Sequence, residues 1–376
     1  MVASAVAALY ILNLPAVVVQ IVSARYTSIA AGRAKLGSIP RVLVQVSGIG
    51  LALGLAMSAV LLLASGPLAG YLQISDRRVI VTLAFASLTA MLVAATRGAL
   101  QGLRRFVALS INNVLDASTR VVSAAGMILI GLGALGGVIA LMVGPLIAYA
   151  ESLFLFGGLR GKDADAPTPL SQVSRYAALT AVGAIGTTYL YNVDVVLSKH
   201  YLAAEAAGIY AAASILGRVV YFLGLTIAQV MFPEVATLHA KDEPHYHVVD
   251  LSLALIGIVA VGLTVVYAAV PGIVLLPFGG AFSPVRAYLW PFAIALGLLS
   301  IINLLINYFL SVGSARFSAP LAGACLLETV LIALFHSSPG QVLGMVLITM
   351  SLLAAVLGSM YVVERLTASA GLRKAN

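Results

Sequence analysis

Long apolar stretches separated by short polar connections run through the whole chain. Each is about 20 residues long, enough for a helix to cross a hydrocarbon layer about 30 Å thick. The pattern therefore predicts eleven membrane-spanning helices with short connections and no separate soluble domain. Their ranges are near 3–24, 42–65, 79–96, 107–130, 134–157, 176–198, 206–232, 249–272, 287–312, 317–335 and 340–363.

The composition supports this interpretation. Of the 376 residues, 61% are hydrophobic and 9% are charged, whereas soluble domains have about 45–50% apolar and about 25% charged residues. Such a chain cannot cover itself with a water-soluble surface, so we expect an all-α polytopic membrane protein. The single cysteine, Cys325, lies in an apolar run and excludes a disulfide framework. We expect neither a metal site nor a cofactor.

The basic residues predict the orientation in the membrane. If the connection after the first helix is cytoplasmic, most Lys and Arg residues, Arg97 among them, collect on the cytoplasmic side. The other side receives Arg77, Arg78, Lys199 and Arg286. This bias places the C-terminus in the cytoplasm. It also accounts for the net charge of +8, so we expect no nucleic-acid partner.

An internal repeat predicts two lobes. Gln20 corresponds to Gln229, and Arg105 to Arg316, at offsets of 209 and 211 residues. Parallel repeats are a common way to build a transporter. We expect an N-terminal lobe of about five helices (1–158), a cytoplasmic linker (159–175) and a C-terminal lobe of six helices (176–376). The repeat implies twelve helices in all, the first of which would precede residue 1.

Asp116 and Arg120 are two charges one helical turn apart within an apolar segment. Measured from Arg105, they lie about 16 Å and about 22 Å along the helix. Asn113 shares their face of the helix. Because a charge at such depth costs about 2.5–3.5 kcal/mol, this face should line a polar cavity. The alternative is a structural pair in which the two charges neutralise each other.

A second polar face is predicted in the other half, and it consists of Tyr210, Ser214, Arg218 and Tyr221. Arg218 has no acidic neighbour on its own helix. It therefore requires either an anionic ligand, for which a planar guanidinium is suited, or an ion pair with Asp194 or Glu328 from another helix.

Further polar residues lie within apolar runs. Asp194, Glu151 and Glu328 are candidates for binding a proton or another cation. Asn303 and Asn307, one turn apart, offer neutral groups that suit a sugar or a neighbouring helix.

Four stretches carry a resemblance to a known family. They are "LPAVVVQIVSARYTSIAAG" (14–32), "RGALQGLRRFVALSINNVLDASTRVV" (97–122), "NVDVVLSKHYLAAEAAGIYAAASILGRVVYFLG" (192–224) and "VMFPEVATLHAK" (230–241). Together they resemble the polysaccharide flippase branch of the multidrug/oligosaccharidyl-lipid/polysaccharide exporter superfamily. The resemblance implies a monomeric, non-enzymatic transporter in the bacterial inner membrane. It would move undecaprenyl-pyrophosphate-linked oligosaccharide by alternating access, through a cavity between two lobes, with a proton or sodium ion as a candidate coupling partner.

Two alternatives remain open at this stage. A cation-coupled multidrug exporter of the same superfamily would favour acidic and aromatic groups over Arg218. A membrane polysaccharide polymerase or ligase would be expected to carry a large outer loop, and the predicted outer loops are short.

Overall fold

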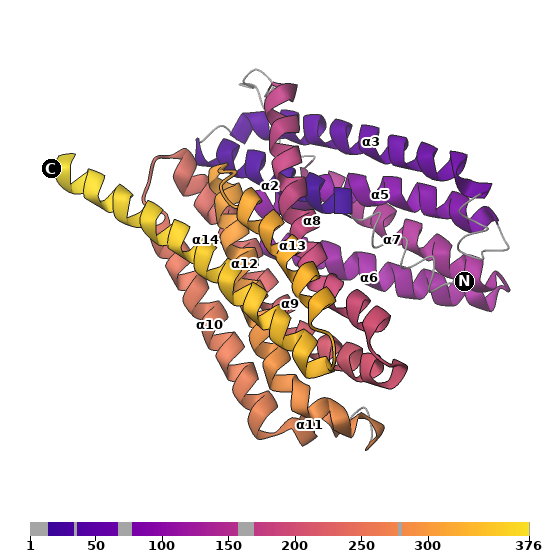
Figure 1. Cartoon of the computed structure of the whole chain (residues 1–376). Helices are drawn as coiled ribbons and strands as arrows, with labels where there is room; N and C mark the ends of the chain where they lie inside the picture. The colour runs from indigo at the N-terminus through magenta and orange to yellow at the C-terminus, as the bar shows by residue number, and fades with distance from the viewer. Residues whose placement is uncertain (1–13, 34–35, 67–76, 157–168, 277–279, 376) are drawn as a thin grey trace. The chain divides into compact units, whose positions relative to one another are not determined.

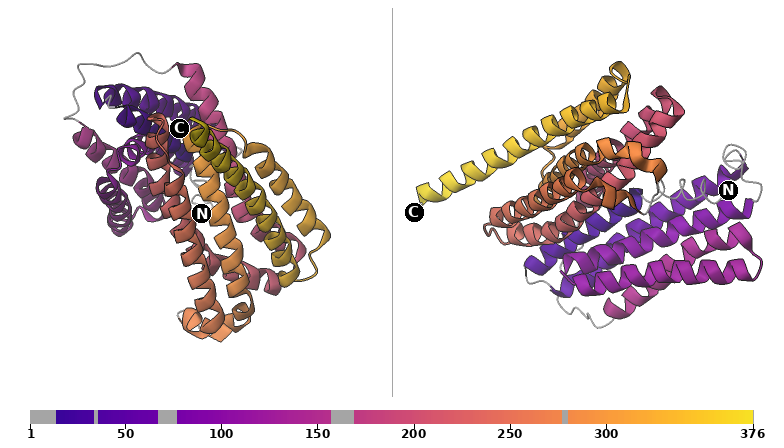
Figure 2. Two further views of the ribbon diagram at one scale, coloured as in Figure 1. Left: turned by 90° about the vertical axis from the view of Figure 1, so that its left-hand side faces the viewer. Right: turned by 90° about the horizontal axis from the view of Figure 1, so that it is seen from below.

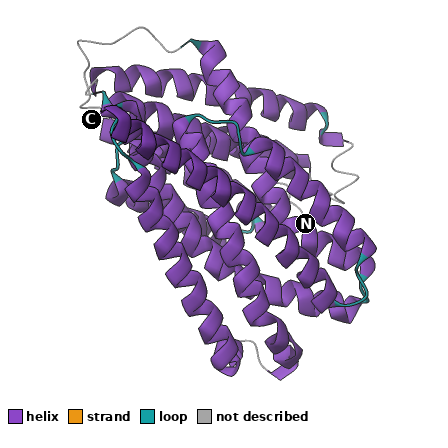
Figure 3. Cartoon of the chain, turned by 60° about the vertical axis from the view of Figure 1, so that its left-hand side comes forward, coloured by secondary structure: helices purple, strands orange, loops and turns teal. Residues whose placement is uncertain are grey.

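The computed structural model describes residues 14–33, 36–66, 77–156, 169–276 and 280–375. All regular structure in these residues is helical (Figure 3). By its internal contacts the chain divides into two compact units, residues 1–181 with 236–242 and residues 182–235 with 243–376. Each unit is described by itself. The predicted linker lies outside the described residues up to 168, and the two predicted lobes remain a prediction.

Within the described residues, the first unit contains five long helices and part of two others (Figure 1). The five are α2 (Leu14–Gly32), α3 (Ile39–Leu63), α5 (Arg77–Gly102), α6 (Phe106–Leu129) and α7 (Gly133–Phe156), and the short η1 (Leu36–Ser38) precedes α3. Helices α8 (Leu170–Tyr201) and α9 (Ala204–Ala240) each contribute residues to both units.

The second unit contains the remaining elements. They are α10 (Tyr246–Ala269), α11 (Pro271–Leu275), η3 (Gly280–Tyr288), α12 (Leu289–Val312), α13 (Ser318–Leu334) and α14 (Pro339–Ala375). Helix α12 packs against α10 and α14, and most of its residues are buried. It forms the apolar centre of this unit.

Eight helices in the described part of the chain are long and apolar enough to cross a membrane. Helices α6 and α8, with 24 and 32 residues, are long enough but more polar, and α13 is apolar but has 17 residues. With these three, the long helices coincide with the eleven predicted segments, of which the first is described from Leu14 onward. The protein is thus a multi-pass membrane protein.

Helix α5 contacts α2, α3 and α7. Figure 2 shows the indigo to magenta helices of the first unit lying side by side. Glycines let α2 approach closely, because a Cβ at Gly98 would meet the carbonyl of Gln20 and one at Gly102 the carbonyl of Ala24. The Ser23 hydroxyl also donates a 2.6 Å hydrogen bond to the carbonyl of Ala95. Small residues at a helix interface are typical of packing within membranes.

Candidate functional site

The first polar cluster is centred on Asp116 in α6. Its Oδ2 accepts a 2.9 Å hydrogen bond from Arg97 Nη2, which comes from α5. Its two oxygens also accept bonds from Arg120, at 2.6 Å from Nε to Oδ1 and 2.9 Å from Nη2 to Oδ2. One carboxylate therefore binds two guanidinium groups. The spacing of Asp116 and Arg120 predicts an ion pair, and the structure contains it. A third member, Arg97, was not predicted from the sequence.

Asn112 connects this cluster to α7. Its Oδ1 accepts a 2.7 Å bond from Arg97 Nε. Its Nδ2 group lies 2.7 Å from the Ala148 carbonyl, 2.7 Å from Glu151 Oε2 and 3.0 Å from Ser152 Oγ. The amide thus links the charged cluster to the backbone and side chains of α7, and it is fully buried.

Gly144 allows α7 to lie directly against the charged pair. A Cβ at this position would meet Asp116 Oδ1, and it would lie 2.5 Å from Arg120 Cγ and 2.8 Å from the Asp116 carbonyl oxygen. A side chain here would therefore displace either α7 or the carboxylate. The absence of a side chain at residue 144 is a condition for the observed geometry.

The exposure of the three paired side chains is uneven. The Asp116 side chain is 7% exposed and that of Arg97 is 15%, whereas that of Arg120 is 33%. Glu151 adds a second negative charge close enough to interact with Arg97. Two arginines and two acids thus balance, and Arg120 is the member that a ligand reaches most easily.

One expectation about this region needs correction, the end of the segment near 79–96, whereas the role of Asn113 stays a prediction. Asn113 is exposed and lies outside the cluster, whereas its neighbour Asn112 is buried within it. The segment near 79–96 was expected to end just before Arg97, but α5 continues through this residue to Gly102, and the Arg97 guanidinium binds Asp116. A charge compensated by a neighbouring helix resembles a segment boundary when hydropathy is considered alone.

The second cluster lies in the other unit, around Arg218 of α9. Its Nη2 donates to two neutral acceptors of α8, the Tyr191 carbonyl at 3.4 Å and Asn192 Oδ1 at 3.2 Å. The guanidinium carbon lies 4.3 Å from the centre of the Tyr191 ring. The centres of the Tyr191 and Tyr221 rings are 4.9 Å apart. Among the described residues, Arg218 forms no ion pair, and its buried Nε has no hydrogen-bond partner. The alternative in which Asp194 or Glu328 pairs with it is thus not observed.

Two buried acids lie in the same unit. Asp194 Oδ2 accepts a 2.8 Å bond from the Tyr210 hydroxyl, while its Oδ1 has no partner in the described part of the chain. Glu328 is completely buried, and both of its oxygens are without a described hydrogen-bond partner. The charges of the two carboxylates are close enough to interact. Such a pair is costly to bury without a proton or cation.

The remaining predicted residues are polar groups at helix interiors. Asn307 Nδ2 donates to both the carbonyl and the Oδ1 of Asn303, at 2.9 Å each. Asn303 Nδ2 is buried without a partner among the described residues, and Ser214 is buried as well. The two asparagines thus bind each other along α12, and the Nδ2 amino group of Asn303 is left without a described acceptor.

The comparison with protein families identifies the chain. The family described as "Polysaccharide biosynthesis protein" matches residues 28–239. The chain belongs to this family. None of the curated proteins is similar enough to count as a match.

Solved structures of transporters share the fold of this family member. A MATE in complex with MaD5 has a TM-score of 0.84 at 12% identity, covering 98% of this chain and 88% of the other. A MOP superfamily transporter from Pyrococcus furiosus, in which the reverse polarity of the binding pocket suggests a different function, has a TM-score of 0.80 at 13% identity, covering 98% and 88%. The MATE transporter ClbM in complex with Rb+ has a TM-score of 0.77 at 15% identity, covering 96% and 86%. The fold is therefore MATE-like.

Proposed function

We propose that this polysaccharide biosynthesis protein flips undecaprenyl-pyrophosphate-linked oligosaccharide across the bacterial inner membrane by alternating access. The family and the transporter fold support transport as the activity. The chemistry of the two arginine clusters supports an anionic substrate. In this proposal the pyrophosphate is the group that the protein recognises, and the C-terminus is cytoplasmic.

The observation that carries the proposal is the environment of Arg218. A guanidinium within a membrane helix is costly unless its charge is compensated. Tyr191 and Asn192 supply a cation–π contact and neutral acceptors. Asp194 is close enough for its charge to interact with that of Arg218, but no described carboxylate forms a direct ion pair with the guanidinium. A pyrophosphate would supply that charge and accept two parallel hydrogen bonds from the guanidinium fork. Arg218 is thus positioned by aromatic and amide groups without being neutralised by them.

Arg120 is the corresponding candidate in the first unit. A third of its side chain is exposed while Asp116 fixes its orientation through two bonds. In the proposal, Arg120 contacts the anionic or hydroxyl-rich head of the substrate, and Arg97 and Asp116 position it. The proposed neutral contacts of the second unit are Tyr210, Ser214, Tyr221, Asn303 and Asn307. Asn113 of α6, whose side chain is exposed, is the proposed neutral contact of the first unit.

The experiment is complementation of a flippase-deficient strain, combined with binding of a lipid-linked pyrophosphate to purified protein. Arg218→Ala should abolish surface polysaccharide at normal expression and weaken binding about tenfold or more, as expected for loss of a charge-assisted bond. Arg218→Lys should be intermediate because it keeps the charge but loses the fork. Lys199→Ala, which removes an exposed cation at the end of α8, is the matched control. Unchanged binding by Arg218→Ala would exclude this residue from the substrate site.

A cation-coupled drug exporter is a second candidate, and the buried acids favour it. Asp194 and Glu328 together leave three oxygens without a described partner, which is a suitable environment for a proton or sodium ion. Glu151 is less suitable because Asn112 already donates to it. One similar structure is a MATE transporter in complex with Rb+. Drug resistance conferred by the wild type and lost in Glu328→Gln, with polysaccharide export absent throughout, would favour this candidate over the flippase.

A further inference from the structure

A second arginine has an environment like that of Arg218. The guanidinium carbon of Arg25, in α2, lies 4.1 Å from the centre of the Tyr176 ring, in α8. The Nε of Arg25 is buried and has no acceptor among the described residues. In the described part of the chain, Arg25 and Arg218 are the two arginines that combine a cation–π contact with an unpartnered buried nitrogen. Arg25 and Tyr176 both belong to the first unit, so each unit holds one such arginine.

The aromatic rings around Arg25 do not neutralise it. The Tyr26 ring lies edge-on to that of Tyr176, with 6.0 Å between the ring centres and 84° between the ring planes. The charge of Arg25 acts on both tyrosines, and no carboxylate of the described residues acts on either. Among those residues, Arg25 also forms no ion pair. A cation–π contact attracts the guanidinium to the ring face but leaves its charge in place.

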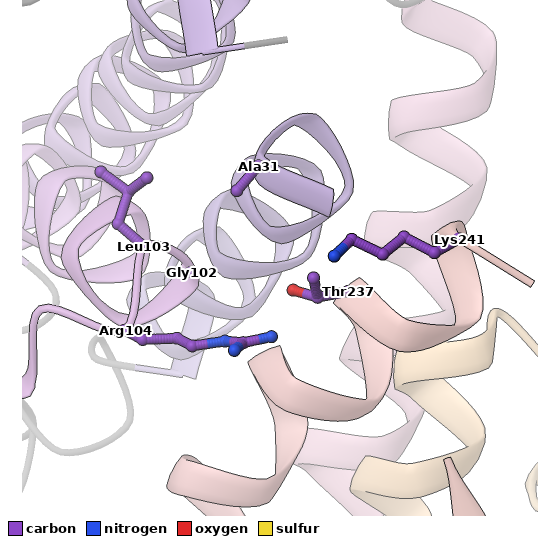
Figure 4. Close-up of a pocket in the computed structure, with 6 residues that line it drawn as sticks. All are labelled: Ala31, Gly102, Leu103, Arg104, Thr237 and Lys241. Atoms are coloured by element: carbon purple, nitrogen blue, oxygen red, sulfur yellow. The ribbon is translucent and has the colours of Figure 1, made fainter. Parts of the chain in front are cut away.

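Arg25 lies further inside the helix than the basic residues around the end of α2. Figure 4 shows this end, where a small cavity lies beside Ala31, and the side chains of Arg104 and Lys241 extend towards it. Those two residues are exposed, so water solvates their charges. Arg25 is partly buried, and it precedes Ala31 by about 9 Å along the helix. An arginine near a helix end can extend towards water, whereas Arg25 lies against the ring of Tyr176.

We propose that Arg25 binds a phosphate of the transported substrate, an assignment that rests on the flippase function proposed above. A phosphate accepts two parallel hydrogen bonds from a guanidinium, and it supplies the negative charge that Tyr26 and Tyr176 lack. Because Arg25 is partly exposed, a ligand can reach its guanidinium. The distribution of basic residues predicts that the end of α2 is cytoplasmic. Arg25 would therefore bind the phosphate on the side from which the substrate enters.

Two other roles for Arg25 lead to different expectations. The phosphate could belong to the headgroup of an anionic phospholipid, which basic residues near a membrane surface attract. Alternatively, Arg25 could bind no anion and only hold α2 against α8 through the Tyr176 ring. A substrate contact requires that loss of the guanidinium weakens binding of a prenyl pyrophosphate. A purely structural contact requires that the same loss destabilises the protein and leaves binding unchanged.

The test uses the full-length protein in nanodiscs of phosphatidylcholine, with farnesyl pyrophosphate as the substrate-like probe. Nanodiscs with equal parts of phosphatidylcholine and phosphatidylglycerol are the lipid probe. The readouts are the dissociation constant for farnesyl pyrophosphate and the thermal unfolding midpoint. Arg25→Met replaces the guanidinium with an apolar side chain that can still contact an aromatic ring, and Arg25→Lys keeps the charge. Arg33→Gln is the matched control, because it removes an exposed cation directly after α2.

We expect Arg25→Met to bind farnesyl pyrophosphate about tenfold more weakly than wild type, and Arg25→Lys to be intermediate. Arg33→Gln should bind like wild type. Without a ligand, Arg25→Met should unfold at the temperature of wild type or above it, because it no longer buries part of a charge. A lower midpoint with unchanged affinity would overturn the proposal in favour of a structural contact. Stabilisation by phosphatidylglycerol that Arg25→Met loses, again with unchanged affinity for the pyrophosphate, would overturn it in favour of a lipid site.

The variants also separate the role of Arg25 from the proposed function. If Arg218→Ala loses binding of farnesyl pyrophosphate while Arg25→Met retains it, the role of Arg25 is wrong and the flippase function stands. If the wild type itself does not bind the prenyl pyrophosphate, the proposed substrate and the role of Arg25 are both wrong. Loss of binding in both variants, with normal binding in Arg33→Gln, would support one phosphate-binding arginine in each unit.

Discussion

Replacing Gly144 with alanine tests whether α7 lies against the charged cluster. The added methyl group would coincide with Asp116 Oδ1 and approach Arg120 Cγ to 2.5 Å. Relieving this overlap requires α7 to move or the carboxylate to leave its two arginines. Overpacking of this kind costs about 1–3 kcal/mol. Gly144→Ala should therefore lower the free energy of unfolding by about that amount, despite the better helix propensity of alanine.

Gly137 in the same helix supplies the matched control. A Cβ at Gly137 would meet nothing within 4 Å, so Gly137→Ala should stabilise the helix by about 0.5–1 kcal/mol. Both variants would be unfolded by denaturant in mixed micelles, and their free energies compared with wild type. Equal stabilisation by the two substitutions would refute the close approach of α7 to Asp116, and with it the described geometry of the cluster.

Four further predictions concern the Asp116 cluster, the Tyr361 hydroxyl and the orientation in the membrane. Asp116→Asn should lower the free energy of unfolding by about 3–5 kcal/mol, because it leaves two arginines without their carboxylate. The double variant Asp116→Asn/Arg120→Gln should recover part of this loss and insert normally, yet fail to restore surface polysaccharide, whereas full transport would make the pair purely structural. Tyr361→Phe removes a 2.8 Å bond to Asp250 and a 3.2 Å bond to the Tyr246 carbonyl, and should cost about 0.5–1.5 kcal/mol in the same unfolding assay. A reporter fused to the C-terminus should be cytoplasmic, and labelling from outside the cell would contradict the orientation deduced from the basic residues.

Hydropathy predicts the positions of the long helices well because each must satisfy its backbone hydrogen bonds within an apolar stretch. The segment predicted near 107–130 is α6, Phe106–Leu129. Helix ends are predicted less well. The segment predicted to end near 232 continues through Pro233 to Ala240, and the one predicted to end near 363 continues to Ala375. A helix that extends beyond the hydrocarbon layer becomes polar while remaining helical, so hydropathy alone places its end too early.

Contacts within one helix are visible in the sequence, and contacts between helices are not. The spacing of Asp116 and Arg120 predicts that they meet, and the structure shows the pair. The third partner, Arg97, comes from α5, and no pattern along the chain connects it with Asp116. The choice between Asn112 and Asn113 depends on which face of α6 contacts α7, and adjacent residues differ by about 100° around a helix. Gly144 was missed for the same reason, because its importance lies in what approaches it.

The two arginine clusters differ in what an anionic ligand must displace. An anion that approaches Arg120 competes with Asp116, which already occupies two of its nitrogens at 2.6 and 2.9 Å. An anion that approaches Arg218 meets a guanidinium whose direct contacts are neutral acceptors and an aromatic ring, and the nearby Asp194 does not form a direct ion pair with it. Binding at Arg218 therefore requires no ion pair to break, whereas binding at Arg120 exchanges one carboxylate for another anion. Initial recognition of a pyrophosphate should accordingly depend more on Arg218. The Asp116 cluster is better suited to a weaker contact that releases its ligand easily. The Asp116 carboxylate is always present to bind Arg120 again in place of the ligand.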